Sequence, residues 1–198
     1  MERRGQGARD GPRILLMNKT QQDALFGELF QAYRQPIYAY LFHMVGDLAH
    51  AEELVQDVFV NAYRALPRLD QGANRRAWLY KIATNAARDW FRRQRTRRWL
   101  PFAADSGEDA EDREDRGEAA EPAQELSLPM EDALSVAEAL NQLKPIYREP
   151  LILFAVEGLS TEEIGAILGL SRSGVKMRLA RARALFASAY GADQNAST

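Results

Sequence analysis

Five residues of a predicted helix share one face and combine four cations with one amide. They are spaced by four, three, four and three positions: Lys81, Asn85, Arg88, Arg92 and Arg95. Such spacing places side chains along one line of an α-helix. The cations could neutralise phosphates, and the amide of Asn85 could hydrogen-bond a base edge. Aromatic groups able to stack on unpaired bases lie nearby: Trp78, Tyr80, Trp90 and Trp99. This pattern favours a nucleic-acid surface over a face that only keeps the helix soluble.

A second basic helix is predicted after residue 171, directly behind a short apolar helix. Ser160 and Glu163 have the spacing of a capping box, and Gly169 can end the short helix in a left-handed conformation. Ser171 can cap the following helix. Its inward positions are apolar: Val175, Leu179, Ala182 and Phe186. Its outward positions are polar or basic: Arg172, Ser173, Lys176, Arg178 and Arg181. A short helix, a turn with glycine and a basic helix indicate a helix-turn-helix that binds DNA.

The net charge of −2 for the 198 residues hides a strong segregation of charge. Residues 73–98 contain nine bases and one acid, and residues 171–190 contain five bases and no acid. Between them, residues 99–132 contain twelve acids and two bases. Residues 105–125 also lack aromatic and β-branched side chains, so they cannot bury enough apolar surface to offset the entropy of ordering. We predict two polyanion-binding units joined by a flexible acidic linker.

Apolar side chains at helical spacing predict an all-α fold of two small helical domains. In the first domain, helices are expected around residues 26–44, 51–66 and 78–91, with Pro36 kinking or splitting the first and Pro67 stopping the second. In the second domain, a helix ending near Pro145 and another terminated by Gly158 precede the helix-turn-helix. The predicted division is as follows: an extension at 1–20, a first domain at 21–98, the acidic linker at 99–131, a second domain at 132–190 and a polar tail at 191–198.

Composition and histidine placement argue against catalysis and cofactor binding. The chain contains no cysteine, which excludes disulfides and thiolate metal sites. The two histidines, His43 and His50, share a helical face only if Gly46 and Asp47 do not break the helix. No nucleophilic triad, phosphate-binding glycine loop or metal-ligand cluster is present in the sequence. We expect no cofactor, no metal and no small-molecule substrate. Apolar runs are too short for a membrane span or signal peptide, so a cytoplasmic location is expected.

Three motifs in a fixed order resemble one protein family. They are AEELVQDVF at 51–59, AWLYKIATN at 77–85 and LSTEEI at 159–164, with the linker between the second and third. The sequence from about residue 22 to 188 resembles the extracytoplasmic-function (ECF) group of the bacterial sigma-70 family, the promoter-specificity subunits of RNA polymerase. The resemblance implies that residues 21–98 form region 2 and residues 132–190 form region 4.

The resemblance also implies a role for each set of residues. Glu53, Gln56 and Asp57 on the acidic face of the second helix would contact the coiled coil of the polymerase β′ subunit. The flap of the β subunit would be a further contact. Asn85 would help to hold a flipped base of the −10 element, and the loop at 69–75 would close over it. The other −10 residues would be Trp78, Tyr80, Lys81, Arg88 and Arg92. The −35 element would be read by Arg172, Ser173, Lys176, Arg178 and Arg181.

Two positions depart from the family pattern. Asp89 stands where an amide is common, which favours a hydrogen-bond donor on the captured base. Ala180 stands where bulkier residues occur, so the −35 preference cannot be copied from relatives.

The expected partners are core RNA polymerase, promoter DNA and an anti-sigma factor, which in this family is often membrane-anchored. An alternative also fits the helix-turn-helix: an autonomous regulator that binds duplex DNA without polymerase. That alternative leaves the basic line on the third helix without a role.

Overall fold

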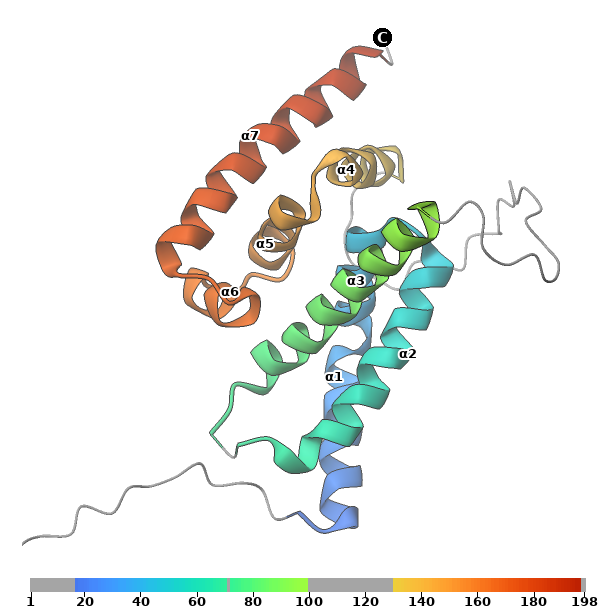
Figure 1. Cartoon of the computed structure of the whole chain (residues 1–198), viewed down its shortest axis with the longest axis vertical. Helices are drawn as coiled ribbons and strands as arrows, with labels where there is room; N and C mark the ends of the chain where they lie inside the picture. The colour runs from blue at the N-terminus through green and yellow to red at the C-terminus, as the bar shows by residue number, and fades with distance from the viewer. Residues whose placement is uncertain (1–16, 71, 100–129, 197–198) are drawn as a thin grey trace, which may run out of the picture.

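The computed structural model describes residues 17–70, 72–99 and 130–196, which form two helical units. The first unit contains α1 (Lys19–Val45), α2 (Leu48–Ala65), the short 3₁₀ helix η1 (Leu66–Arg68) and α3 (Arg75–Trp99). The second contains α4 (Met130–Gln142), α5 (Pro145–Ala155), α6 (Thr161–Leu168) and α7 (Arg172–Ala196). Figure 1 shows α3 between the α1–α2 pair and the second unit. The predicted all-α class is confirmed, whereas the acidic linker lies almost wholly outside the described residues.

Side-chain caps and prolines set the ends of the helices in the first unit. Asn18 forms a capping box with Gln21 at the start of α1, and Gly46 ends it with a φ of 74°. Asp47 then caps α2 by accepting a hydrogen bond from the His50 amide. The predicted break at Gly46 and Asp47 is confirmed. Pro36 is predicted to kink or split α1; the split is wrong, because the helix runs as one element from Lys19 to Val45.

The helix-turn-helix has the local structure that the sequence predicts. Ser160 and Glu163 form the capping box of α6, and Gly169 ends α6 with a φ of 70°. The Leu170 amide donates to the Gly165 carbonyl at 2.9 Å, and Ser171 caps α7 through the Gly174 amide at 3.1 Å. All four predicted inward positions of α7 are buried or half-buried. Helix α7 extends to Ala196, beyond Tyr190 where the sequence predicts a polar tail.

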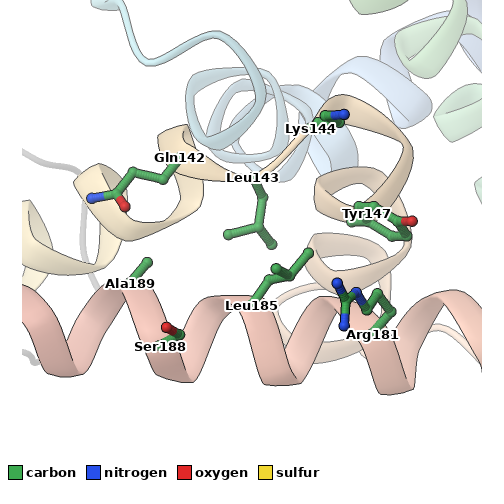
Figure 2. A pocket seen from close by; sticks show the side chains of 8 residues that line it. All are labelled: Gln142, Leu143, Lys144, Tyr147, Arg181, Leu185, Ser188 and Ala189. Atoms are coloured by element: carbon green, nitrogen blue, oxygen red, sulfur yellow. The ribbon is translucent and has the colours of Figure 1, made fainter.

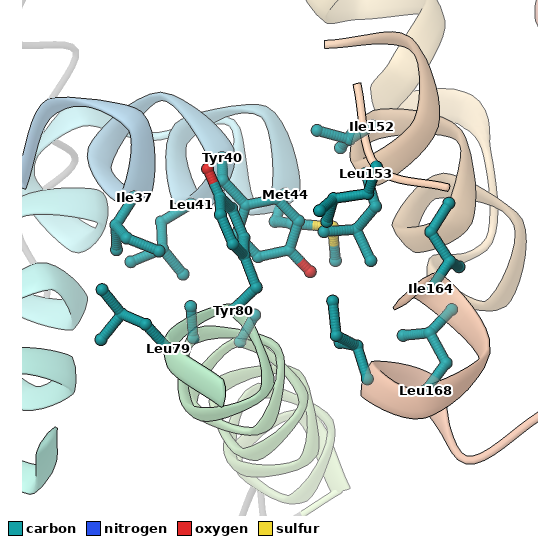
Figure 3. Packing of buried hydrophobic residues seen from close by; sticks show 14 of the residues in the cluster. Ile37, Tyr40, Leu41, Met44, Leu79, Tyr80, Ile152, Leu153, Ile164 and Leu168 are labelled. Carbon is teal, nitrogen blue, oxygen red and sulfur yellow. The ribbon is translucent and has the colours of Figure 1, made fainter. Parts of the chain in front are cut away.

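One hydrophobic core runs through both units. From the first unit, α1 and α3 contribute Ile37, Tyr40, Met44 and Leu79, all fully buried. From the second, α5 and α6 contribute residues of the same cluster, such as Leu153 and Ile164. Figure 3 shows these side chains converging between the helices. The sequence predicts two tethered domains, but it does not predict that they pack on each other, because apolar periodicity does not specify the partner of a helix face.

The tightest backbone approach in the helix-turn-helix is at Gly165. A Cβ atom there would lie 2.7 Å from the carbonyl oxygen of Leu170, which is a backbone atom and cannot rotate away. We expect Gly165→Ala to lower the free energy of unfolding by about 2 kcal/mol. The matched control is Gly27→Ala in α1, where nothing lies within 4 Å of the added Cβ. That variant should gain about 0.5 to 1 kcal/mol. Denaturant unfolding monitored by circular dichroism measures both, and equal effects would contradict the prediction.

Candidate nucleic-acid interfaces

The basic line on α3 is only partly open to solvent. Lys81, Asn85, Arg92 and Arg95 are exposed, as their spacing predicts. Arg88 is half-buried because α5 lies against it. Its Nε atom is 2.8 Å from Glu149 Oε1 and its Nη2 atom is 2.6 Å from Oε2, so the two side chains form a bidentate pair. The Glu149 side chain is only 3% exposed. Arg88 therefore neutralises a carboxylate that α5 buries between the units.

Tyr80 does not lie on the surface that the sequence assigns to it. It is fully buried, and its ring packs edge-on to that of Tyr40 at 5.6 Å between centroids. Its hydroxyl donates to the Glu157 carboxylate, which comes from the segment after α5. Burial is the main cause of a raised pKa at the Tyr80 hydroxyl and also at the Glu157 carboxyl. The sequence pattern misses this burial because Tyr80 faces the second unit.

The other aromatic candidates near the line are partly covered within the first unit. Trp78 is half-buried and packs against both hydrophobic clusters. Trp90 is half-buried between the rings of His50, at 5.4 Å, and Phe91, at 5.0 Å. The side chain of Trp99 lies outside the described residues.

Further polar contacts join the start of α3 to the segment after α5 and to α6. Arg76 donates to the Glu157 carbonyl, and its guanidinium lies 5.8 Å from the centre of the Tyr80 ring. Asn74 caps α3 through the Ala77 amide and also donates to Glu163 Oε1 at 3.0 Å. The loop at 69–75 therefore contacts the helix-turn-helix in this arrangement.

Arg148 joins the carbonyl ends of two helices at the centre of the molecule. It donates to the Met44 carbonyl at the end of α1 and to the Asn141 carbonyl at the end of α4, the latter at 2.6 Å. A further bond of 3.1 Å reaches the Leu143 carbonyl. A cation suits helix C-termini, where carbonyl groups lack partners. Burial lowers the pKa of the Arg148 guanidinium to about 10, which leaves it charged at neutral pH.

Helix α7 presents its candidate DNA-binding cations on two flanks. Arg172, Ser173, Lys176 and Arg181 are exposed and Arg178 is half-buried. Arg172 Nε lies 2.8 Å from Glu162 Oε1 of α6, which ties the start of α7 to the first helix of the motif. Arg181 lines a pocket of about 480 Å³ between α7 and the turn from α4 to α5 (Figure 2). The other lining side chains include Tyr147 and Leu185.

Sequence reasoning missed one exposed residue of α7, Met177. Met177 is 69% exposed, the highest value among the large apolar residues that are exposed in the described structure. The prediction of a basic DNA-binding surface on α7 includes no role for Met177. The signal was available, because residue 177 falls on the outward side once Val175, Leu179 and Ala182 are placed inward.

The acidic face of α2 is open to solvent. Glu53, Gln56 and Asp57 are all exposed, as predicted. Val60 lies one turn further along the same face and is 47% exposed. The face therefore combines acids, an amide and an apolar side chain, and a basic protein surface would complement its charge.

The positions of the histidines, the acidic side chains and the apolar helices bear on metal binding and on membrane insertion. His43 lies in α1 and His50 in α2, on either side of the break at Gly46. Within the described ranges, no group of three histidine or acidic side chains could hold a metal ion. In the same ranges, no helix has both the length and the apolar character needed to cross a membrane.

Comparisons with known proteins identify both units. The model of sigma-70 region 2 matches residues 29–97, and that of sigma-70 region 4 matches residues 133–186. These ranges correspond to the two helical units of the structure. The chain therefore belongs to the ECF group of the sigma-70 family of RNA polymerase sigma factors.

Two curated relatives illustrate the match. RNA polymerase sigma factor CnrH of Cupriavidus metallidurans is 38% identical over 142 residues, which cover 72% of this chain and 74% of CnrH. The probable RNA polymerase sigma factor RfaY of Xanthomonas campestris is 32% identical over 160 residues, or 80% of this chain. The matched part spans only 38% of the length of RfaY.

Solved structures match across both units. The sigma factor RpoE, in complex with the anti-sigma factor NepR from Bartonella quintana, has a TM-score of 0.67 at 26% identity. The match covers 85% of this chain and 98% of RpoE. CnrH in complex with the cytosolic domain of CnrY has a TM-score of 0.63, covering 86% and 90% of the two chains. Both matches therefore extend over the two helical units of the structure.

The Arg88–Glu149 pair should contribute more to stability than an exposed pair on the same helix. Breaking a buried pair leaves an uncompensated charge, although the partial exposure of Arg88 reduces the cost. We expect a coupling free energy of about 1 to 2 kcal/mol from the cycle Arg88→Ala, Glu149→Ala and the double variant. The control pair, Arg92 and Asp89, is 3.1 Å apart with both side chains more than half exposed. It should give about 0.5 kcal/mol or less. Similar couplings in the two cycles would refute the prediction.

Proposed function

We propose that the two units divide promoter recognition between them and that they must separate to do so. In this proposal the chain directs core RNA polymerase to specific promoters in the cytoplasm and has no catalytic role of its own. Glu53, Gln56 and Asp57 dock on the coiled coil of the β′ subunit, and region 4 contacts the β flap. The docking role of these three α2 residues is supported by their exposure to solvent beside the exposed Val60.

Region 4 anchors the −35 element as duplex DNA. The proposed contacts are made by Arg172, Ser173, Lys176, Arg178 and Arg181. Residues 171–190, which contain five bases and no acid and follow a tight turn, support this role, because such a helix can enter the major groove beside two phosphate backbones. An autonomous regulator with the same helix-turn-helix is not favoured, since both sigma regions are present in one chain.

Region 2 captures the −10 element as a melted strand. Asn85 holds a flipped base, with Trp78, Lys81 and Arg92 beside it. Asn85 is exposed between cations on α3, so a base could reach its amide in the packed arrangement. Unstacking a base costs a few kcal/mol, which base capture and phosphate contacts offset.

One observation carries the proposed separation: two −10 candidates, Tyr80 and Arg88, are covered by the second unit. Tyr80 is buried against Glu157, and Arg88 is paired with Glu149. Tyr80 cannot contact DNA until the segment after α5 moves away from α3, and Arg88 would have to exchange Glu149 for a phosphate. Binding to polymerase would separate the units and expose both side chains. An anti-sigma factor would favour the packed arrangement, a proposal supported by the likeness to the NepR and CnrY complexes.

The promoter role of Asn85 is tested by transcription in vitro with core polymerase and a mixed promoter library. We expect new initiation sites that require the protein and that weaken about ten-fold or more with Asn85→Ala, because a base-holding amide is lost. The control is Gln31→Ala, an exposed amide on α1. It should leave initiation unchanged. Absence of initiation together with tight duplex binding by the protein alone would instead establish an autonomous regulator.

Separation of the units is tested by energy transfer between two dyes. The chain has no cysteine, so Gln31→Cys on α1 and Ala187→Cys on α7 supply unique labelling sites. We expect efficient transfer in the free protein and a marked loss when core polymerase is added. Glu149→Ala should lower transfer in the free protein, because Arg88 loses its partner across the interface. Asp89→Ala, which breaks only an exposed pair, should not. Equal transfer with and without polymerase would rule out the proposed separation.

A further inference from the structure

The outermost line of α7 is not basic. Ser173, Met177, Ala180 and Ala184 recur at steps of four, three and four, so they form one line along the helix, and all four are exposed. We call this line the α7 ridge. It lies opposite the buried positions Val175, Leu179 and Ala182. The part of the helix that projects furthest therefore carries small or apolar side chains, with Met177 as the only large one.

Cations lie on both flanks of the ridge. Lys176 and Arg183 lie on one side, and Arg178 and Arg181 on the other, as the helical spacing requires. Two of these cations lie beside neighbouring helices. Arg183 lies 5.0 Å from the centre of the Phe154 ring in α5, and Arg181 lines the pocket beside α4 and α5. The helix thus presents an apolar edge between two rows of positive charge.

This arrangement matches the major groove of duplex DNA, where phosphates border both sides and base edges form the floor. Cations on the flanks would contact the two backbones and leave the ridge facing the bases. The apolar group on the floor of the major groove is the C5-methyl of thymine, and apolar side chains contact it. Met177 is unbranched and flexible, so it can follow the position of a methyl group. Neither Met177 nor Ala180 can donate or accept a strong hydrogen bond to a base edge.

We infer that Met177, supported by Ala180, reads a thymine methyl group in the −35 element. The inference rests on the proposed function, since it assumes that α7 enters the groove of that element. It assigns the specificity of this chain to an apolar contact, in addition to the cations that the charge pattern singles out. It also gives a role to the most exposed large apolar side chain of the described structure.

Replacement of single thymines by uracil tests the inference, because uracil lacks only the methyl group. The holoenzyme selects its −35 sequence from a random library, and each thymine of the selected duplex is then replaced in turn. At one or two positions we expect binding of the wild-type holoenzyme to weaken about four-fold, the factor that corresponds to burial of one methyl group. Met177→Ser should bind the thymine and uracil duplexes equally at those positions. The control Ile146→Ser, at an exposed apolar residue of α5, should keep the wild-type response.

The outcomes separate the inference from the function on which it rests. Promoter-specific transcription with no uracil effect at any position would overturn the role of Met177 and leave the sigma function intact. The same holds if Met177→Ser keeps the wild-type response, or if the selected element contains no thymine. If the holoenzyme fails to direct promoter-specific transcription at all, the proposed function itself is wrong.

Discussion

Two consecutive charged residues of α5, Arg148 and Glu149, are buried at the centre of the molecule, and the arrangement of its helices depends on them. Arg148 satisfies carbonyl groups at the ends of α1 and α4, while Glu149 pairs with Arg88 of α3. A buried charge without a partner is costly, so these contacts must be made together. They hold α5 against the first unit. Once α5 is placed, the shared apolar core places α6 and the helix-turn-helix beside the start of α3.

Helix α3 consequently contributes both to the contact between the units and to the candidate DNA-binding surface. One side contributes Leu79 and Tyr80 to the core between the units, and another carries the exposed line of Lys81, Asn85 and Arg92. Arg88 lies at the boundary between these two sides of α3 and forms an ion pair with Glu149. Two residues at this boundary, Tyr80 and Arg88, are therefore ones that nucleic acid would also use, beside the apolar core that joins the units.

The local structure follows from particular residues in the sequence. The box of Ser160 and Glu163 begins α6, and Gly169 ends it with a positive φ as predicted. Periodicity on α7 also identifies its buried positions. Periodicity does not identify a residue that is buried by a distant part of the chain. Tyr80 is predicted to lie on the DNA face, but its ring is buried against Tyr40. Pro36 is predicted to kink or split α1, and the helix is not split, since it continues through Pro36 to Val45. A single missing amide donor does not end a helix whose flanking residues are held by packing, as Ile37 and Tyr40 are.

The sequence by itself determined the helical class, the two basic helices, the turn between α6 and α7 and the resemblance to sigma factors. These depend on short-range rules, since caps, turns and periodic faces involve residues a few positions apart. Only the tertiary structure decided that the units share a core, that Tyr80 is buried beside Glu157 and that Glu149 of α5 pairs with Arg88. It also showed how far Met177 is exposed. The physical reason is that an amphipathic face specifies that it will be covered, but not by which element. That choice depends on shape and on pairing buried charges between residues far apart in the chain, such as Arg88 and Glu149.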